Sequence, residues 1–412
     1  MRRAVSLGLL AIVLAAVVAA GQQATRVFVV AGGEVVELDG ATFAATRRIP
    51  LPKEVAGAAG GPAVSRGGQV LSCPPRAEGR PCWLFDGLAG RWIARPARGP
   101  AVHAVDSSRS VPWSVLSADG RALFWFENEY RVAGDRDDAS DSAPSVSVTF
   151  RAWRTDLSGT GDSPVATLAF EPCRCATGAC EETCPEAAVW TPDGGVDDFF
   201  IVSRWIPGQL TAAYQSSAVY RRTSDGWTAT PLPRPLETVL DADEGAQAIV
   251  HAVNDTGCCG WMNESPDRTW LLRNGTNVPL FDERGEYGND DYDVSFYTPN
   301  ASFSPGGRQV AMTIASTLAR GEAVRLLHDG QADPPELQRV QRAAAGLPAV
   351  VVADLTGKVP RRVARIRRAT LVGWLGEGRL LLRRDKRFEA WDVRGATGTT
   401  IAIPDGARVL VR

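Results

Sequence analysis

The sequence lacks the motifs on which most enzyme classes depend. It has no H-E-x-x-H zinc pair, no G-x-S-x-G nucleophile motif, no P-loop and no G-x-G-x-x-G opening a βαβ unit. Only three histidines occur, His103, His251 and His328, and none forms a paired metal motif. His251 lies in the apolar run A-I-V-H-A-V, where a hydrogen-bonded core residue is the simpler interpretation. Enzymes that need these motifs are therefore disfavoured.

An excess of one charge is also absent. The 412 residues carry 45 basic and 47 acidic groups, which gives no reason to expect nucleic acid as a partner. The charge is unevenly distributed, however. Residues 127–200 hold 15 acidic against 5 basic groups, and residues 361–412 hold 13 basic against 5 acidic groups. We favour solvated faces, with arginines that discourage edge pairing, over a dipolar binding surface.

The N-terminus has the layout of a secretory signal. Arg2 and Arg3 precede an uncharged, apolar run over 4–20, which ends in small residues before Gln22 and Gln23. This order is typical of a signal peptide, here 1–20, that is removed on export. A retained membrane anchor is the alternative, but about 17 residues is the short limit for spanning a bilayer. We therefore expect a secreted or periplasmic protein without membrane insertion after cleavage.

Because secreted and periplasmic proteins lie in oxidising compartments, we expect the eight cysteines to form disulfides. Cys73 and Cys82 bracket a Pro- and Gly-containing loop, and a bridge between them would clamp a hairpin end. Four more cysteines lie within twelve residues: Cys173, Cys175, Cys180 and Cys184. Four thiolates could bind zinc, but neither pair has the C-x₂-C spacing. We expect two local disulfides here, with their connectivity open.

The last two cysteines are adjacent. Cys258 and Cys259 stand between Gly257 and Gly260 in the segment D-T-G-C-C-G-W. Neighbouring Cα atoms are about 3.8 Å apart, closer than ordinary disulfides prefer, so a bridge between them would form a strained, rigid turn. We favour this vicinal bridge, with pairing of each cysteine to a distant partner as the alternative.

Short apolar runs separated by Gly, Pro and Asp recur along the mature chain. Five of them read as two strands around a tight turn: 26–38, 111–127, 188–205, 300–314 and 371–382. Such segments are hairpin signatures, and their recurrence predicts an all-β repeat architecture. One segment, 331–346, has a helical pattern, with Pro335 near its start and Gly346 past its end.

The hairpin turns resemble the repeat core of TolB-like and WD-type β-propellers, in which an aromatic–Ser–Pro–Asp–Gly turn precedes an apolar strand. Residues 303–311 read F-S-P-G-G-R-Q-V-A and residues 190–194 read W-T-P-D-G. Residues 116–120 (L-S-A-D-G) and 374–378 (W-L-G-E-G) match more loosely. The D-T-G-C-C-G-W segment is similar to exported bacterial propeller-like proteins. The resemblance implies an exported bacterial β-propeller.

Hairpin counting sets the number of blades. Units start near residues 26, 63, 111, 188, 247, 300 and 370. We expect one seven-bladed domain over 21–412, with insertions near 135–147, 172–186 and 331–346. Six or eight blades, or a β-sandwich, are the alternatives. The C-terminal run A-R-V-L-V-R has no neighbouring partner strand, so we expect it to pair with the first blade and close the ring.

The best candidate binding segment is 254–263, N-D-T-G-C-C-G-W-M-N. Asp255, Trp261 and Asn263 combine an aromatic face with polar groups, and Tyr287 and Tyr292 follow in the next loop. Such side chains suit a sugar or a peptide edge. The same loop contains three acidic residues that could offer oxygen ligands to Ca²⁺, although it lacks EF-hand spacing and a solvated loop is favoured: Asp290, Asp291 and Asp293.

Two functions follow from this sequence. The first is a non-catalytic exported propeller, a monomer without a required cofactor, that binds a protein, glycan or envelope component through loops on one face. The second is a propeller enzyme, a lyase or glycoside hydrolase, that uses carboxylates in the central pocket. We favour the first.

Overall fold

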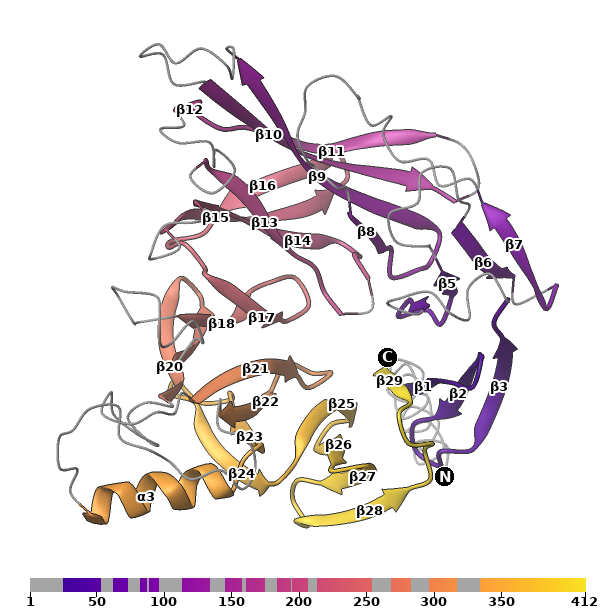
Figure 1. Cartoon of the computed structure of the whole chain (residues 1–412), viewed down its shortest axis with the longest axis vertical. Coiled ribbons are helices and arrows are strands. Elements are labelled where there is room, and N and C mark those ends of the chain that lie inside the picture. Colours follow the sequence, from indigo (N-terminus) through magenta and orange to yellow (C-terminus); the bar gives the residue numbers. More distant parts are fainter. Residues whose placement is uncertain are drawn as a thin grey trace, which may run out of the picture.

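The structure is a computed structural model of the chain. It describes residues 25–52, 62–72, 82–86, 89–95, 113–133, 145–157, 161–174, 184–193, 195–206, 213–253, 268–282, 296–316 and 334–412. The described strands form seven antiparallel sheets. Each sheet contains a row of four hydrogen-bonded strands, and one sheet has a short fifth strand. In Figure 1 these sheets radiate around one axis, so the fold is an all-β, seven-bladed β-propeller. Seven blades is the number expected from the hairpin count, and the sandwich alternative is excluded.

The blades follow the order of the chain. Blade 1 contains β29 (Arg408–Val411), β1 (Arg26–Ala31), β2 (Glu34–Asp39) and β3 (Ala45–Pro50). Blade 2 contains β4 (Ala63–Val64), β5 (Val70–Ser72), β6 (Cys82–Asp86) and β7 (Arg91–Arg95). Blade 3 contains β8 (Trp113–Leu116), β9 (Ala122–Ala133), β10 (Ser145–Asp156) and β11 (Asp162–Ala169), with the short β12 (Cys173–Arg174) paired to β10.

The remaining four blades are built in the same way. Blade 4 contains β13 (Glu186–Trp190), β14 (Phe199–Ile206), β15 (Ala213–Thr223) and β16 (Gly226–Pro231). Blade 5 contains β17 (Thr238–Ala242), β18 (Ala248–Val253), β19 (Arg268–Arg273) and β20 (Thr276–Asp282). Blade 6 contains β21 (Phe296–Phe303), β22 (Gln309–Ser316), β23 (Ala349–Asp354) and β24 (Arg361–Arg367), with helix α3 (Pro334–Ala345) before β23. Blade 7 contains β25 (Thr370–Gly376), β26 (Arg379–Arg384), β27 (Arg387–Asp392) and β28 (Thr397–Ile401).

The C-terminal strand closes the ring, as the sequence predicts. Val411 lies opposite Val27 and Val409 opposite Val29 in the antiparallel pair of β29 with β1. The Arg26 amide donates to the Arg412 carbonyl at 2.8 Å, and the Arg412 amide donates back to Arg26 at 2.9 Å. β29 therefore becomes the inner strand of blade 1, which removes two open sheet edges.

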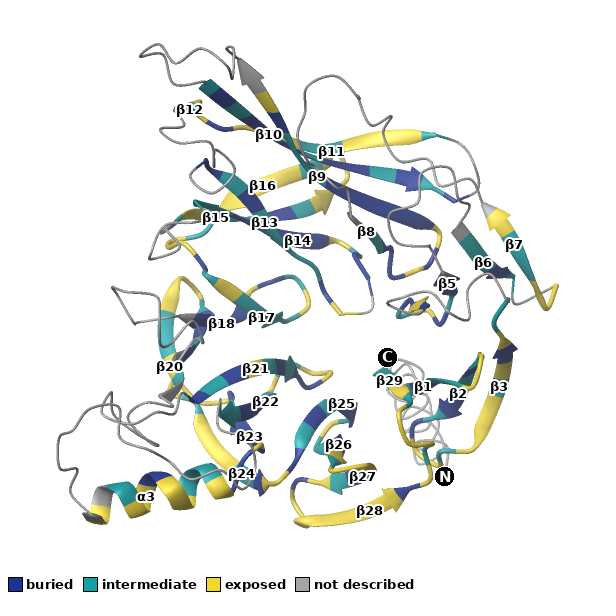
Figure 2. Cartoon of the chain, in the orientation of Figure 1, coloured by how far each residue is buried: buried dark blue, intermediate teal, exposed yellow. Residues whose placement is uncertain are grey.

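The core is divided among the seven blade interfaces. Successive residues of a strand point to opposite faces of its sheet, so a strand between two blades is apolar on both sides. In β26, Leu380 and Leu382 pack toward blade 6, whereas Leu381 packs toward blade 1. In β18, Val250 packs toward blade 6 and Ile249 toward blade 4. Figure 2 shows this burial along the middle strands and exposure of the outer strand of several blades.

The tight turns between the first and second strands of blades 2, 3, 5 and 6 share one kind of hydrogen bond. Ser65 Oγ accepts from the Gln69 amide at 2.9 Å, Ser117 Oγ accepts from the Ala122 amide at 2.9 Å, and Ser304 Oγ accepts from the Gln309 amide at 3.2 Å. In blade 5 Asp243 takes the role of the serine and accepts from the Ala248 amide at 2.8 Å. This substitution hides one copy of the turn motif, so the sequence analysis places the start of blade 5 at 247, one strand too late.

The two ends of the ring carry different connections. We call the end with the turns between first and second strands the hairpin side, and the opposite end the loop side. Because the strands alternate in direction, Glu186 at the start of β13, Ile206 at the end of β14 and Ala213 at the start of β15 all lie on the loop side. The same rule places the strand ends Val253 and Arg268 there.

Candidate ligand-binding site

The binding residues expected from the sequence lie outside the described residues. These are Asp255, Trp261, Asn263, Tyr287 and Tyr292, together with the calcium candidates Asp290, Asp291 and Asp293. Five of the eight cysteines also lie outside: Cys73, Cys175, Cys180, Cys258 and Cys259. The described strands that flank the two loops of the binding residues, β18 with β19 and β20 with β21, end or begin on the loop side. Both loops therefore leave and re-enter the described strands at that end of the ring.

A row of one carboxylate and two aromatic side chains lies at the loop-side end of blade 4. Glu186 is directly opposite Trp205 in the pairing of β13 with β14, and Trp205 is opposite Tyr214 in the pairing of β14 with β15. Directly paired residues project from the same face of an antiparallel sheet. The Trp205 and Tyr214 rings stack with centroids 5.8 Å apart and an interplanar angle of 19°. All three side chains are half-buried.

Blade 3 anchors the inner end of this row. The Tyr130 hydroxyl donates a hydrogen bond to Glu186 Oε2. Two residues earlier, the Asn128 amide pairs with the Ala187 backbone, donating to its carbonyl at 2.9 Å and accepting from its amide at 3.1 Å. Burial raises the pKa of Glu186, although the bond from Tyr130 opposes this by stabilising the carboxylate. Glu186 is thus held in place while lacking the solvation of a surface carboxylate.

Blade 5 supplies a second carboxylate, Glu237, whose charge acts on Tyr214. Burial raises the pKa of Tyr214, and the negative charges of Glu237 and Glu186 raise it further. Glu237 immediately precedes β17, at the loop-side end of blade 5. We call Tyr130, Glu186, Trp205, Tyr214 and Glu237 the acid–aromatic row. Its chemistry is a flat aromatic surface with two carboxylates nearby, which suits sugar hydroxyls or cationic side chains.

A disulfide fixes the approach of the chain to this row. Cys173 and Cys184 are bonded, with their Cα atoms 5.5 Å apart. Cys173 lies opposite Val146 in the pairing of β12 with β10, and Cys184 is fully buried two residues before Glu186. The bond therefore ties the entry to β13 to blade 3. It also establishes one pairing inside the cysteine cluster that the sequence leaves open.

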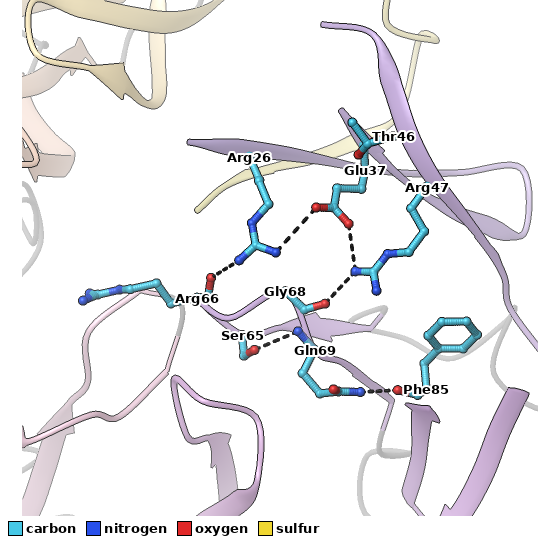
Figure 3. A network of polar contacts seen from close by, with 9 residues as sticks. All are labelled: Arg26, Glu37, Thr46, Arg47, Ser65, Arg66, Gly68, Gln69 and Phe85. Carbon is cyan, nitrogen blue, oxygen red and sulfur yellow. Dashed lines mark hydrogen bonds and ion pairs between the residues drawn. The ribbon is translucent and has the colours of Figure 1, made fainter. Parts of the chain in front are cut away.

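The hairpin side contains polar contacts that join blades. Figure 3 shows Glu37, only 11 % exposed, between two arginines of blade 1: its Oε2 lies 2.8 Å from Arg47 Nη2 and its Oε1 lies 3.5 Å from Arg26 Nη1. Both guanidiniums continue to blade 2, where Arg26 donates to the Arg66 carbonyl at 2.9 Å and Arg47 donates to the Gly68 carbonyl at 2.8 Å. Each guanidinium contacts both Glu37 of blade 1 and a backbone carbonyl of blade 2, so we assign these contacts to blade docking.

Opposite charges also meet between distant blades at this end. Arg66 of blade 2 lies 3.3 Å from Asp197 beside blade 4 and 3.8 Å from Glu244 of blade 5. Asp241, on the inner strand of blade 5, accepts the Phe303 amide of blade 6 at 2.7 Å. Burial raises the pKa of Asp241 to about 7. These ion pairs and this hydrogen bond link blades 2, 4, 5 and 6.

The single histidine of the described strands is structural. His251 is buried, and its Nε2 lies 2.9 Å from Asn277 Oδ1 of the neighbouring blade 5 hairpin. Burial lowers the pKa of His251, which favours the neutral ring. The core role expected from its apolar surroundings in the sequence is confirmed.

The described residues form neither a metal-binding cluster nor a membrane-spanning helix. Within the described ranges, no group of three or more His, Cys, Asp or Glu side chains is placed to hold a metal ion. Of the helices that the structure describes, none combines the length and apolar character needed to cross a bilayer.

Comparison with known proteins yields similarity of fold only. No protein-family model and no curated protein matches the sequence. Among solved structures, AztD from Citrobacter koseri is 11 % identical, with a TM-score of 0.42 over 94 % of this chain and 98 % of that one. Pyrococcus horikoshii acylaminoacyl peptidase is 12 % identical, with a TM-score of 0.42 over 92 % of this chain and 51 % of the peptidase. Porphyromonas gingivalis dipeptidyl peptidase 4 is 10 % identical, with a TM-score of 0.46 over 90 % and 56 %.

This chain thus spans about half the length of either peptidase. At these identities and TM-scores no activity is transferred from any of the three proteins.

The acid–aromatic row could not be recognised from the sequence alone. Its members come from five strands or strand ends of three blades, and Tyr130 is 56 residues before Glu186. The one local signal is an aromatic residue near the loop-side end of two consecutive strands, R-W-I in β14 and A-Y in β15. That signal becomes meaningful only when the register of the sheet is known.

Proposed function

We propose that the protein is an exported, non-catalytic β-propeller that binds a protein, glycan or other envelope component through the loop side of its ring. The observation that supports this best is the stack of Trp205 on Tyr214, beside Glu186 and within reach of the charge of Glu237. A half-exposed aromatic pair leaves apolar ring surface in contact with water, and a bound ligand would cover it. The nearby carboxylates would fix the orientation of that ligand.

The loop side also carries the longest connections between blades. Ligand-binding residues of rigid scaffolds are commonly placed on such loops. The binding residues predicted from the sequence, Asp255, Trp261, Asn263, Tyr287 and Tyr292, belong to connections that leave strands at this end. The proposal therefore joins the described row and the predicted loops into one binding face.

The test uses two tryptophans of the same sheet. Trp205→Ala removes the row, whereas Trp190→Ala removes a half-buried tryptophan stacked on Phe199 at the opposite end of β13. The labelled protein is applied to an array of immobilised bacterial glycans and to a peptide array. We expect Trp205→Ala to weaken retention about tenfold, as loss of an aromatic anchor does, with little effect from Trp190→Ala. Equal retention by the two variants would remove the row from the binding site.

A catalytic role is the second candidate, because Glu186 is a half-buried carboxyl with a raised pKa, and general acids often share this property. Chromogenic aryl glycosides and polyuronate chains serve as substrates. Turnover by the wild type that disappears in Glu186→Gln would favour the enzyme. Retention on the arrays without turnover would favour the binding protein.

A further inference from the structure

The outer rim of blade 6 concentrates positive charge. Residues 334–369 contain eight basic and two acidic residues. Four arginines in and just after β24 are exposed: Arg361, Arg362, Arg367 and Arg368. β24 is the outermost strand of its blade, so these side chains stand at the edge of the ring. Arginine on an edge strand also prevents pairing with other sheets. The residues beside these arginines decide whether edge protection is their whole role.

Helix α3 extends the same rim. Its Val340 is buried against the blade core, while Arg339 and Arg342 are exposed. The end of the helix meets the end of β24, where the Arg368 amide donates to the Gly346 carbonyl at 3.1 Å. Figure 1 shows α3 beside β24 at the periphery. Two secondary-structure elements therefore present arginine to solvent from neighbouring positions.

Exposed valines interrupt this charged edge. Val359 is 71 % exposed and Val363 is 38 % exposed, and they are the exposed large hydrophobic residues found among the described parts of the chain. Val363 is the extra residue of a β-bulge, because Ala353 pairs with Arg362 while Val352 pairs with Ala364. Protection of an edge accounts for arginines and for a bulge. It does not account for apolar side chains turned toward water.

We propose that the rim of blade 6, formed by residues 358–368 with Arg339 and Arg342, docks on an anionic phospholipid surface. Guanidinium groups bind phosphate, and each basic residue near an anionic membrane raises the affinity about fivefold. The valines select the membrane over a soluble polyanion, because only the lipid interface offers apolar groups beside the phosphates. The contact lies at the outer edge of blade 6 and leaves the acid–aromatic row of blade 4 free for its own ligand.

Vesicle sedimentation tests this assignment. The mature protein is mixed with vesicles of phosphatidylglycerol and phosphatidylcholine in equal amounts, or of phosphatidylcholine alone. We expect sedimentation with the anionic vesicles only, weakening as salt is raised. No sedimentation at low salt would overturn the proposal. Retention on heparin without vesicle binding would also overturn it, in favour of a soluble polyanion.

Three variants assign the contact to the rim. Arg361→Gln with Arg367→Gln should lower vesicle affinity about 10- to 30-fold. Val359→Ser with Val363→Thr should lower it several-fold while leaving retention on heparin unchanged. Arg91→Gln with Arg222→Gln removes the same charge from exposed sites on blades 2 and 4 and should leave binding within about twofold of the wild type. Equal losses in the first and third variants would show that vesicle binding depends on net charge alone, which contradicts a specific rim. Melting temperatures verify that each variant is folded.

Discussion

The guanidinium of Arg412 lies 2.9 Å from the carboxylate of Asp193, which joins the closing strand of blade 1 to the hairpin turn of blade 4. The pair is asymmetric, because the arginine side chain is 6 % exposed and the aspartate side chain 83 % exposed. Arg412 Nε also donates to the Val64 carbonyl of blade 2 at 3.0 Å. One buried arginine thus contacts three blades near the axis. Most of its contribution to the free energy of unfolding should come from burial and from the bond to Val64.

Substitution of the two partners should therefore have unequal effects. We expect Arg412→Ala to lower the free energy of unfolding by about 1–3 kcal/mol, because it leaves the Val64 carbonyl without its partner and empties a buried volume. Asp193→Asn should cost less than about 1 kcal/mol, as expected for a pair with a solvated carboxylate. Urea unfolding measures both. Equal losses would mean that the ion pair itself holds the closure.

Gly68 tests the docking of blade 1 on blade 2. A Cβ at this position would lie 2.3 Å from Arg26 Nη1, and the backbone φ is +79°. Gly90 has a similar φ of +63° but open space around the added atom. We expect Gly90→Ala to cost about 1 kcal/mol through backbone strain alone, and Gly68→Ala to cost at least about 1 kcal/mol more by displacing Arg26 from Glu37. Thermal unfolding measures both variants. An equal loss of stability in Gly68→Ala and Gly90→Ala would refute the role of this contact.

Asp241 makes the stability of the fold depend on pH. Its folded pKa, raised to about 7 by burial, exceeds the ordinary value of 3.8. The protonated form is therefore favoured in the folded state, so this contribution to stability is complete below about pH 4 and is lost as pH rises through 7. Asp241→Asn should match the wild type near pH 4 and be more stable above pH 7, by about 1–3 kcal/mol. Unfolding curves at both pH values provide the measurement, and a constant difference between the proteins would contradict it.

The Cys173–Cys184 bond should stabilise the entry to blade 4. It closes a loop with a sequence separation of 11. The double variant Cys173→Ser, Cys184→Ser should lose about 2–3 kcal/mol by the loop-entropy relation. Peptide mapping without reduction should recover the two residues in one linked fragment. Recovery of Cys173 linked to Cys175 or Cys180 would contradict the pairing. We also expect no free thiol among all eight cysteines of the mature protein.

Much of the architecture was readable from local pattern. Each predicted hairpin is a pair of neighbouring strands in one blade, because period-2 apolar runs and Ser- or Gly-containing turns are decided within about ten residues. The closing role of β29 followed from the same rule, since a lone apolar strand without a neighbour needs a distant sheet edge. β17 was missed because Asp241 breaks its apolar pattern and Asp243 replaces the serine of the turn.

The site was decided by tertiary structure. Strand formation and the positions of most turns depend on residues close together in the chain, so both could be predicted from the sequence. Ring closure could be predicted because the C-terminal strand has no partner near it in the chain. Which side chains meet depends on the register between strands and on the order of blades around the axis. Glu186, Trp205 and Tyr214 come together through two strand pairings, and Tyr130 and Glu237 join them from neighbouring blades. No local pattern encodes a contact of that kind, because its energy arises only when three separately folded sheets pack against one another.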